Sequence, residues 1–163
     1  MIGRGGGEGG DLTRDMSDWD DHYTEGQHQL ELNYDEKQMI ELAKQHFDKV
    51  VVLLNMSTTM EVGELQNDPD IDAIVFIGSP GQTGFNAVGK VLNGDVNPSG
   101  RTVDLWSADF TKDPTFVNFG RTSYSNMMEP TFVPGFGCHT DGNFFVQYEE
   151  GIYVAIAIMK RQQ

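Results

Sequence analysis

Residues 49–92, KVVVLLNMSTTMEVGELQNDPDIDAIVFIGSPGQTGFNAVGKVL, repeat one pattern of a strand followed by a helix. KVVVLLN (49–55) and IDAIVFIGSP (71–80) are short aliphatic runs, typical of strands buried on both faces. MEVGELQND (60–68) predicts a short helix between them, and residues 81–92 predict an amphipathic helix after them. Strands that alternate with helices across short loops favour an α/β layered sandwich with a mostly parallel sheet.

The segment before this stretch predicts another helix. LNYDEKQMIELAKQHF (32–47) has apolar residues at helical spacing. Asn33 is a suitable N-cap, and Glu36, three residues later, completes a capping box. This helix would lead directly into the first aliphatic strand.

The segment after it is less regular. TVDLW (102–106) predicts a third strand. Residues 111–147 are rich in aromatic and loop-forming residues, a composition often found in functional loops. FFVQYEEGIYVAIAIM (144–159) alternates enough to predict a last strand.

Composition excludes several classes of protein. The 163 residues fit one domain, since domains commonly have ~100–150 residues. Eleven basic and 25 acidic residues give a net charge of −14, which disfavours nucleic-acid binding. No apolar run approaches the ~20 residues of a membrane-spanning helix, so no membrane partner is expected. The single cysteine, Cys138, is predicted to be a loop thiol, the four histidines have no metal-ligand spacing, and we expect no metal or cofactor.

The glycine run GRGGGEGGD (3–11) contains one carboxylate, Glu8. Such a run is typical of a phosphate-binding loop, of a polar leader or of a loop that carries a catalytic acid. Gly5, Gly7 and Gly10 match Gly-x-Gly-x-x-Gly, but a dinucleotide site needs a strand before the motif and a helix that begins within it. The polar surroundings therefore argue against nucleotide binding.

Four stretches in order resemble the C-terminal α/β sandwich domain of glycoside hydrolase family 3, the β-glucosidase and β-xylosidase family. They are GGEGGD (6–11), KVVVLLN (49–55), PGQTGFNAVGKVLNGDVNPSGR (80–101) and YEEGIYV (148–154). The third is the most specific. The resemblance implies a partial sandwich domain over residues 1–154, with an active-site loop region at 1–32.

The resemblance also implies a function, the hydrolysis of terminal β-linked sugars by a retaining mechanism. Glu8, between Gly7 and Gly9, matches the family's general acid/base. Asp11 is expected to shape the loop or to bind sugar. The nucleophile, about 5–5.5 Å from the acid/base in such enzymes, would come from an N-terminal TIM-like barrel domain that this chain lacks, so we expect the isolated chain to be inactive. The alternative is a non-catalytic carbohydrate-binding or scaffold module.

Two further features follow from the resemblance. MSDWDD (16–21) is similar to the motif around the family's nucleophile, but no aliphatic strand precedes it, so we interpret Asp18 as a loop residue. Met1–Gly3 is interpreted as the end of a strand, from whose carboxyl end the glycine loop would leave.

The last nine residues, 155–163, depart from the family, which continues Gly-Tyr-Arg-Tyr-Tyr-Glu-Thr after the equivalent of Val154. The codons GTA GGC TAT CGC TAT TAT GAA ACG GCA GCA encode that sequence. Removal of one G gives GTA GCT ATC GCT ATT ATG AAA CGG CAG CA, which encodes VAIAIMKRQ and ends in the first two bases of a glutamine codon, in agreement with the residues from Val154 onward. Our hypothesis is a single-base frameshift after Val154, which the coding DNA tests.

Overall fold

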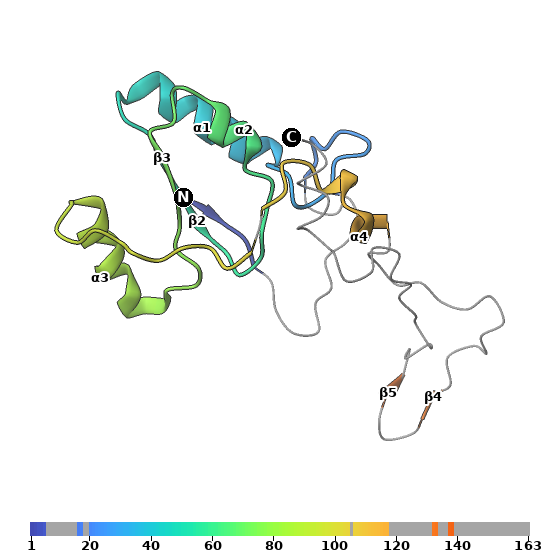
Figure 1. The fold of residues 1–163 in the computed structure, drawn as a ribbon. Helices are drawn as coiled ribbons and strands as arrows, with labels where there is room; N and C mark the ends of the chain where they lie inside the picture. The colour runs from blue at the N-terminus through green and yellow to red at the C-terminus, as the bar shows by residue number, and fades with distance from the viewer. Residues whose placement is uncertain (6–15, 18–19, 105, 118–131, 134–136, 139–163) are drawn as a thin grey trace. The chain divides into compact units, whose positions relative to one another are not determined.

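The computed structural model describes residues 1–5, 16–17, 20–104, 106–117, 132–133 and 137–138. The chain divides into two compact units, with the boundary between Phe110 and Thr111 (Figure 1). Each unit is described by itself. No helix among the described residues is both long enough and apolar enough to cross a membrane.

The first unit has a parallel sheet, as the sequence predicts. Its strands are ordered β1 (Ile2–Gly3), β2 (Val51–Asn55) and β3 (Ala73–Phe76). Ile2 is paired with Leu54, and Val51 with Ala73. The chain passes from β1 to β2 through α1 (Tyr34–His46) and from β2 to β3 through α2 (Gly63–Asn67). The α/β prediction and the interpretation of Met1–Gly3 as the end of a strand are confirmed.

The helix α1 begins at the predicted cap. The Asn33 side chain accepts a hydrogen bond from the Glu36 amide, and the Glu36 side chain accepts one from the Asn33 amide. Two orphan amides of the first turn are thereby satisfied. The predicted capping box is confirmed.

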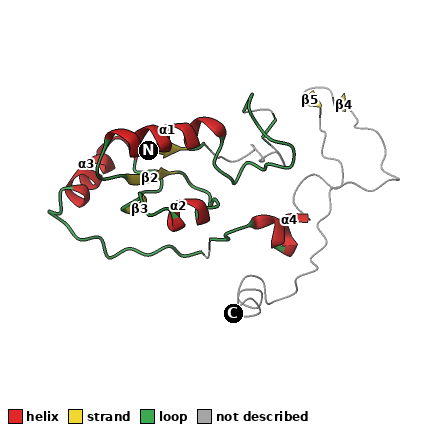
Figure 2. Ribbon diagram, turned by 90° about the horizontal axis from the view of Figure 1, so that it is seen from above, coloured by secondary structure: helices red, strands yellow, loops and turns green. Residues whose placement is uncertain are grey.

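The core lies between the sheet and the two helices α1 and α2. Ile40 of α1, Leu65 of α2 and Leu54 of β2 are buried there. Met56 and Met60, in the connection from β2 to α2, are each 1% exposed. The two helices lie side by side in both ribbon views (Figures 1 and 2). Lys37 pairs with Glu64, and Lys44 pairs with Asp68, across them.

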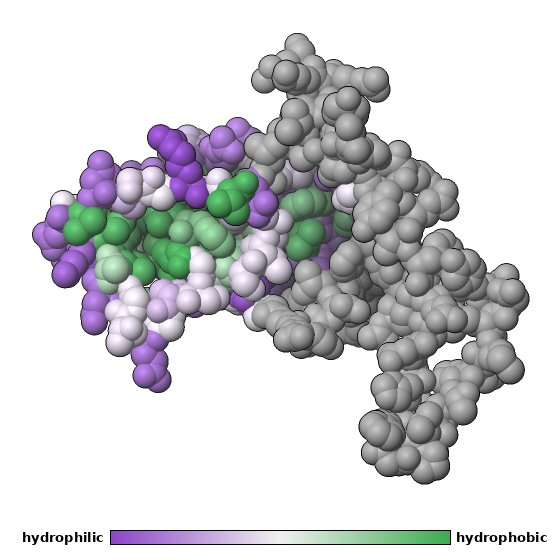
Figure 3. Space-filling model, turned by 60° about the horizontal axis from the view of Figure 1, so that its bottom comes forward, coloured by the Kyte–Doolittle hydropathy of each residue, from purple (hydrophilic) through white to green (hydrophobic). Residues whose placement is uncertain are grey.

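The prediction that both aliphatic strands are buried on both faces is wrong. In β2, Val52 and Leu54 are buried, whereas Val51, the first residue of the strand, is 40% exposed. No residue of β3 is buried. The reason is that α1 and α2 cover one face only, while α3 (Gly81–Leu92), which has the predicted bounds, contributes no buried residue. Apolar atoms therefore reach the surface on the side away from α1 and α2 (Figure 3).

The predicted strand over residues 102–106 is also not formed. Thr102–Asp104 and Trp106, which are its described residues, lie outside any strand, and Val103 is 96% exposed. A strand needs a partner for its backbone groups, and these residues form no ladder with β3. Instead the Trp106 ring packs edge-on against Phe76, with centroids 5.3 Å apart.

Short elements follow at and beyond the boundary. They are η1 (Phe110–Lys112), α4 (Pro114–Val117) and an antiparallel pair of β4 (Phe132–Val133) with β5 (Gly137–Cys138). Cys138 thus lies in a strand paired with Phe132, and its prediction as a loop residue is wrong, because a two-residue ladder leaves no alternation to detect in sequence. The predicted strand at 144–159 and the tail at 155–163 lie outside the described residues.

Candidate active site

The glycine run begins at the carboxyl edge of the sheet. β1 and β2 run parallel, and the last residue of each, Gly3 and Asn55, are paired. The Arg4 amide then donates a hydrogen bond to the Asn55 carbonyl over 3.1 Å. In open parallel sheets this edge is where ligands bind. The start of the loop therefore lies where a catalytic group would be useful.

The two candidate site residues themselves, Glu8 and Asp11, lie outside the described residues, and so does Asp18. Four residues separate the end of β1 from Glu8, and the chain leaves β1 at the carboxyl edge of the sheet. The acid/base role of Glu8 and the sugar-binding role of Asp11 stay predictions.

Arg4 holds the start of this loop against the beginning of α1. Its Nε donates to Glu36 Oε1 over 3.0 Å, and its Nη2 pairs with Glu36 Oε2. The guanidinium also donates to the carbonyls of Gln29 and Glu31. The Arg4 side chain is only 9% exposed, so this pairing is largely shielded from water. Such two-point pairing of arginine with a carboxylate fixes direction as well as distance.

Asp20 joins a turn to the first residue of α1. Its carboxylate accepts hydrogen bonds from the amides of Tyr34 and His22, each over 2.8 Å. These two bonds, with that from Tyr34 the stronger influence, hold the pKa of the Asp20 carboxyl below its ordinary value. Asp20 thus remains an anion that shapes the turn. The described residues next to Asp18, which are 16–17 and 20–21, form no strand of the kind that would precede the family's nucleophile.

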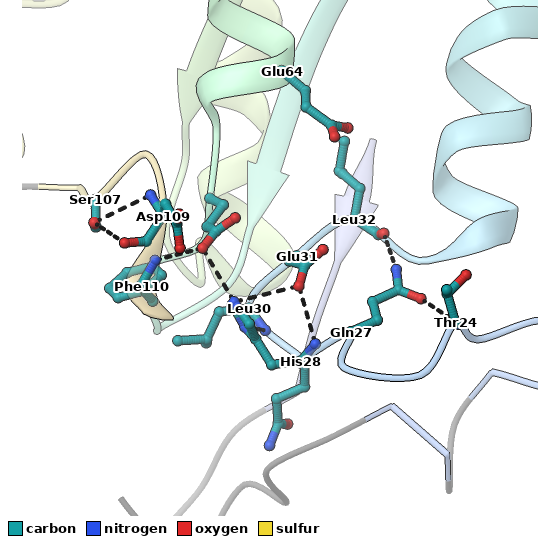
Figure 4. Close-up of polar contacts among 12 residues, drawn as sticks. Thr24, Gln27, His28, Leu30, Glu31, Leu32, Glu64, Ser107, Asp109 and Phe110 are labelled. Atoms are coloured by element: carbon teal, nitrogen blue, oxygen red, sulfur yellow. Dashed lines mark hydrogen bonds and ion pairs between the residues drawn. The ribbon is translucent and has the colours of Figure 1, made fainter. Parts of the chain in front are cut away.

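A second polar cluster surrounds the buried imidazole of His28 (Figure 4). Its Nε2 lies 3.1 Å from Glu61 Oε1 and 3.4 Å from Glu31 Oε1. Glu61 Oε1 also accepts a hydrogen bond from the Phe110 amide over 2.6 Å. Burial raises the pKa of the Glu61 carboxyl, although the hydrogen bond from Phe110 opposes this shift. A carboxyl so occupied acts as a structural acceptor that joins three segments.

The sequence analysis predicted neither the Arg4 cluster nor the His28 cluster. Arg4 lies 32 residues from Glu36, and Glu61 lies 49 residues from Phe110. Partners so far apart form no local motif. The only signal was local to α1, where the capping box marks Glu36 as a residue with a fixed side chain.

The structure refines the argument against a dinucleotide site. A strand, β1, does precede Gly5, as the interpretation of Met1–Gly3 expects, so this requirement of a dinucleotide site is met. The described residues between the motif and α1, which are 16–17 and 20–33, contain no helix, and α1 begins only at Tyr34. A helix that begins within the motif is what a dinucleotide site requires.

A shallow hollow of about 460 Å³ lies beside α2 and β3. Its walls include Leu65, Phe76 and Trp106. Neither Arg4 nor His28 contributes to it. The hollow reaches the carboxyl end of β3 at Phe76, but it is not lined by the residue that anchors the start of the glycine loop.

Comparison with known proteins identifies the family. The model of the glycosyl hydrolase family 3 C-terminal domain matches residues 6–156. The chain is 30% identical over 98 residues to a beta-glucosidase of Ruminococcus albus, covering 60% of this chain and 10% of the relative. It is 27% identical over 119 residues to beta-glucosidase A of Butyrivibrio fibrisolvens, covering 73% of this chain and 12% of the relative. It is 28% identical over 138 residues to probable beta-glucosidase G of Emericella nidulans, covering 82% and 17%.

The chain thus spans between about a tenth and a sixth of the length of these curated relatives. The matched family model covers residues 6–11 of the glycine run, the strands β2 and β3, and the residues of the Arg4 and His28 clusters other than Arg4 itself. This protein belongs to the glycosyl hydrolase family 3 C-terminal domain family.

Proposed function

We propose that this chain supplies the general acid/base, Glu8, to a retaining β-glycosidase that hydrolyses terminal β-linked sugars, with glucosides as the substrate class. The observation that carries the proposal is the point where the glycine run begins, directly after β1. In a family 3 chain, the loop that contains Glu8 leaves β1 at the carboxyl edge of the parallel sheet. The names of the relatives, which are beta-glucosidases, support the substrate class.

Retaining hydrolysis needs two carboxyl groups about 5–5.5 Å apart. One attacks the anomeric carbon while the other protonates the leaving oxygen, and the second then removes a proton from the water that releases the sugar. Glu8 would perform the proton transfers, and the nucleophile would come from an N-terminal barrel domain. Glycines beside Glu8 permit close approach of the backbone to a neighbouring domain. Asp11 would stabilise the loop or bind a sugar hydroxyl.

The test joins this chain to a family 3 barrel domain and varies the leaving group of an aryl β-glucoside. We expect Glu8→Gln to lower kcat/KM for the phenyl glucoside by about 10²–10⁴, the usual contribution of general acid catalysis. The dinitrophenyl glucoside needs little protonation, so its kcat/KM should fall far less. Glu25→Gln, at an exposed carboxylate of the same loop region, is the control and should leave both values unchanged.

Two outcomes would contradict the proposal. Equal losses for both substrates, or none, would favour a non-catalytic carbohydrate-binding or scaffold module. Turnover by the chain without a barrel, abolished by Glu8→Gln, would show that the nucleophile lies within these residues. Azide adds a direct readout, because it should restore turnover of Glu8→Ala as a glycosyl azide if Glu8 serves as the base.

A further inference from the structure

Arg4 is placed at the point where the Glu8 loop leaves the sheet. It follows β1 directly, and its amide still bonds to the end of β2 through the Asn55 carbonyl. Its side chain reaches the first turn of α1 and pairs there with both carboxylate oxygens of Glu36. One residue therefore ties the start of the loop to both the sheet and the helix.

The acceptor of this arginine is itself held in place. Glu36 Oε2 accepts a hydrogen bond from the Asn33 amide over 2.9 Å, and the Glu36 amide donates one to Asn33 Oδ1 over 2.8 Å. The carboxylate thus has little freedom to follow a moving loop. The Gln29 and Glu31 carbonyls add two more acceptors from a separate turn. A lysine has a single ammonium in place of the planar fork and cannot reproduce this set of bonds.

The spacing makes this anchor effective for Glu8. Glu8 follows Arg4 by four positions, and an extended chain reaches at most ~3.6 Å per residue, so the chain between them can span no more than about 14 Å. All three intervening residues are glycines, the residue type with the widest choice of backbone conformations. A fixed first residue therefore matters more here than it would before a stiffer sequence.

We propose that Arg4 is a positioning residue that directs the Glu8 loop by fixing its first residue against α1. The inference rests on the proposed function for its catalytic consequence. Because a displacement of about 1 Å at a reacting group costs up to ~10²-fold in rate, a loosened loop base would weaken proton donation. The loss would fall on substrates that need a proton, in contrast to a general loss of folded protein, which lowers the rate on all substrates alike.

The enzymatic test uses the chain joined to its barrel. We expect Arg4→Lys to lower kcat/KM for the phenyl glucoside about tenfold or more and that for the dinitrophenyl glucoside less than threefold. In a Glu8→Gln background, Arg4→Lys should have no further effect on the ratio of the two. Equal losses on both substrates, or a full additional loss in the Glu8→Gln background, would overturn the positioning role.

A second test uses the full 163-residue chain alone and is independent of catalysis. Backbone amide order parameters of residues 5–10 are measured by NMR relaxation in the wild type, Arg4→Lys, Arg4→Gln and the control Lys49→Gln, whose side chain is 83% exposed. We expect lower order in this loop for the Arg4 variants only, with the amides of β2 unchanged. Unchanged loop order in Arg4→Lys would overturn the inference, even if Glu8 proves catalytic. Lower loop order would support it, even if the proposed acid/base role fails.

Discussion

The helices α1 and α3 have similar lengths and were predicted from the same kind of apolar spacing, yet the structure treats them differently. The 13-residue α1 has a complete capping box and a buried Ile40. The 12-residue α3 has no side-chain cap at Pro80 and no buried residue, and its Phe85 and Leu92 are 41% and 49% exposed. An apolar stripe thus predicts a helix, but its burial depends on a partner surface.

The partner of α1 is assembled from distant parts of the chain. Ion pairs join it to α2, Arg4 joins it to β1, and Asp20 joins its first residue to an earlier turn. None of the hydrogen bonds or ion pairs that the structure gives for its described residues joins α3 to the sheet. The covered and open faces of this sheet should therefore respond differently to matched substitutions.

The largest difference should follow from removing the same side chain on each face. Leu54 is 1% exposed in β2, so Leu54→Ala should reduce the free energy of unfolding by about 2–5 kcal/mol, the usual cost for a buried leucine. Leu92→Ala, at the end of α3, should cost under about 1 kcal/mol, because half of that side chain already faces water. Urea unfolding of both variants measures these values. Similar losses would show that α3 packs as firmly as β2.

Removal of the cap of α1 should have a smaller effect. Asn33→Ala deletes the acceptor of the Glu36 amide and should cost about 1 kcal/mol. Asn93→Ala, at the exposed C-cap of α3, is the control and should change the free energy of unfolding by under about 0.5 kcal/mol. Thermal unfolding followed by circular dichroism gives both values. A neutral Asn33→Ala would mean that the capping box contributes little to the fold.

Two glycines within α3 offer a test in which one substitution should stabilise the protein. A Cβ at Gly89 would meet no atom within 4 Å, so Gly89→Ala should stabilise the helix by up to about 1 kcal/mol. A Cβ at Gly84 would lie 2.8 Å from the Pro80 Cβ, so Gly84→Ala should lose that gain. Melting temperatures of the two variants decide the matter. Destabilisation by Gly89→Ala would indicate that α3 packs against a surface at that position.

Acid should loosen the covered face through two aspartates. A hydrogen bond from the Lys44 side chain lowers the pKa of Asp68, and one from the Val50 amide lowers the pKa of Asp72. Because both folded pKa values lie below the ordinary 3.8, the stability they provide is present above that pH and is lost as the pH falls. Asp72→Asn should flatten the decline in melting temperature below about pH 4, whereas the exposed Asp21→Asn should not. An identical decline in all three proteins would contradict this assignment.

Much of the fold could be predicted because it depends on local signals. The bounds of α3, the cap of α1 and the aliphatic core of β2 follow from spacing and residue type. One-sided burial and the absence of a strand at 102–106 could not be predicted, since both depend on which neighbours cover the sheet.

The candidate site shows the same division. Glu8 is a prediction from its flanking glycines and the family resemblance, whereas the roles of Arg4 and His28 depend on partners 25–49 residues away in the sequence.

The two methionines that follow β2 can report opening of the covered face through their oxidation. Met56 and Met60 are each 1% exposed, whereas Met39, on the outer side of α1, is 41% exposed. Peroxide should convert Met39 to its sulfoxide at the rate of a free side chain and reach Met56 and Met60 only during opening of the core. A mass spectrum of partially oxidised protein would then report how often the layer of α1 and α2 separates from the sheet.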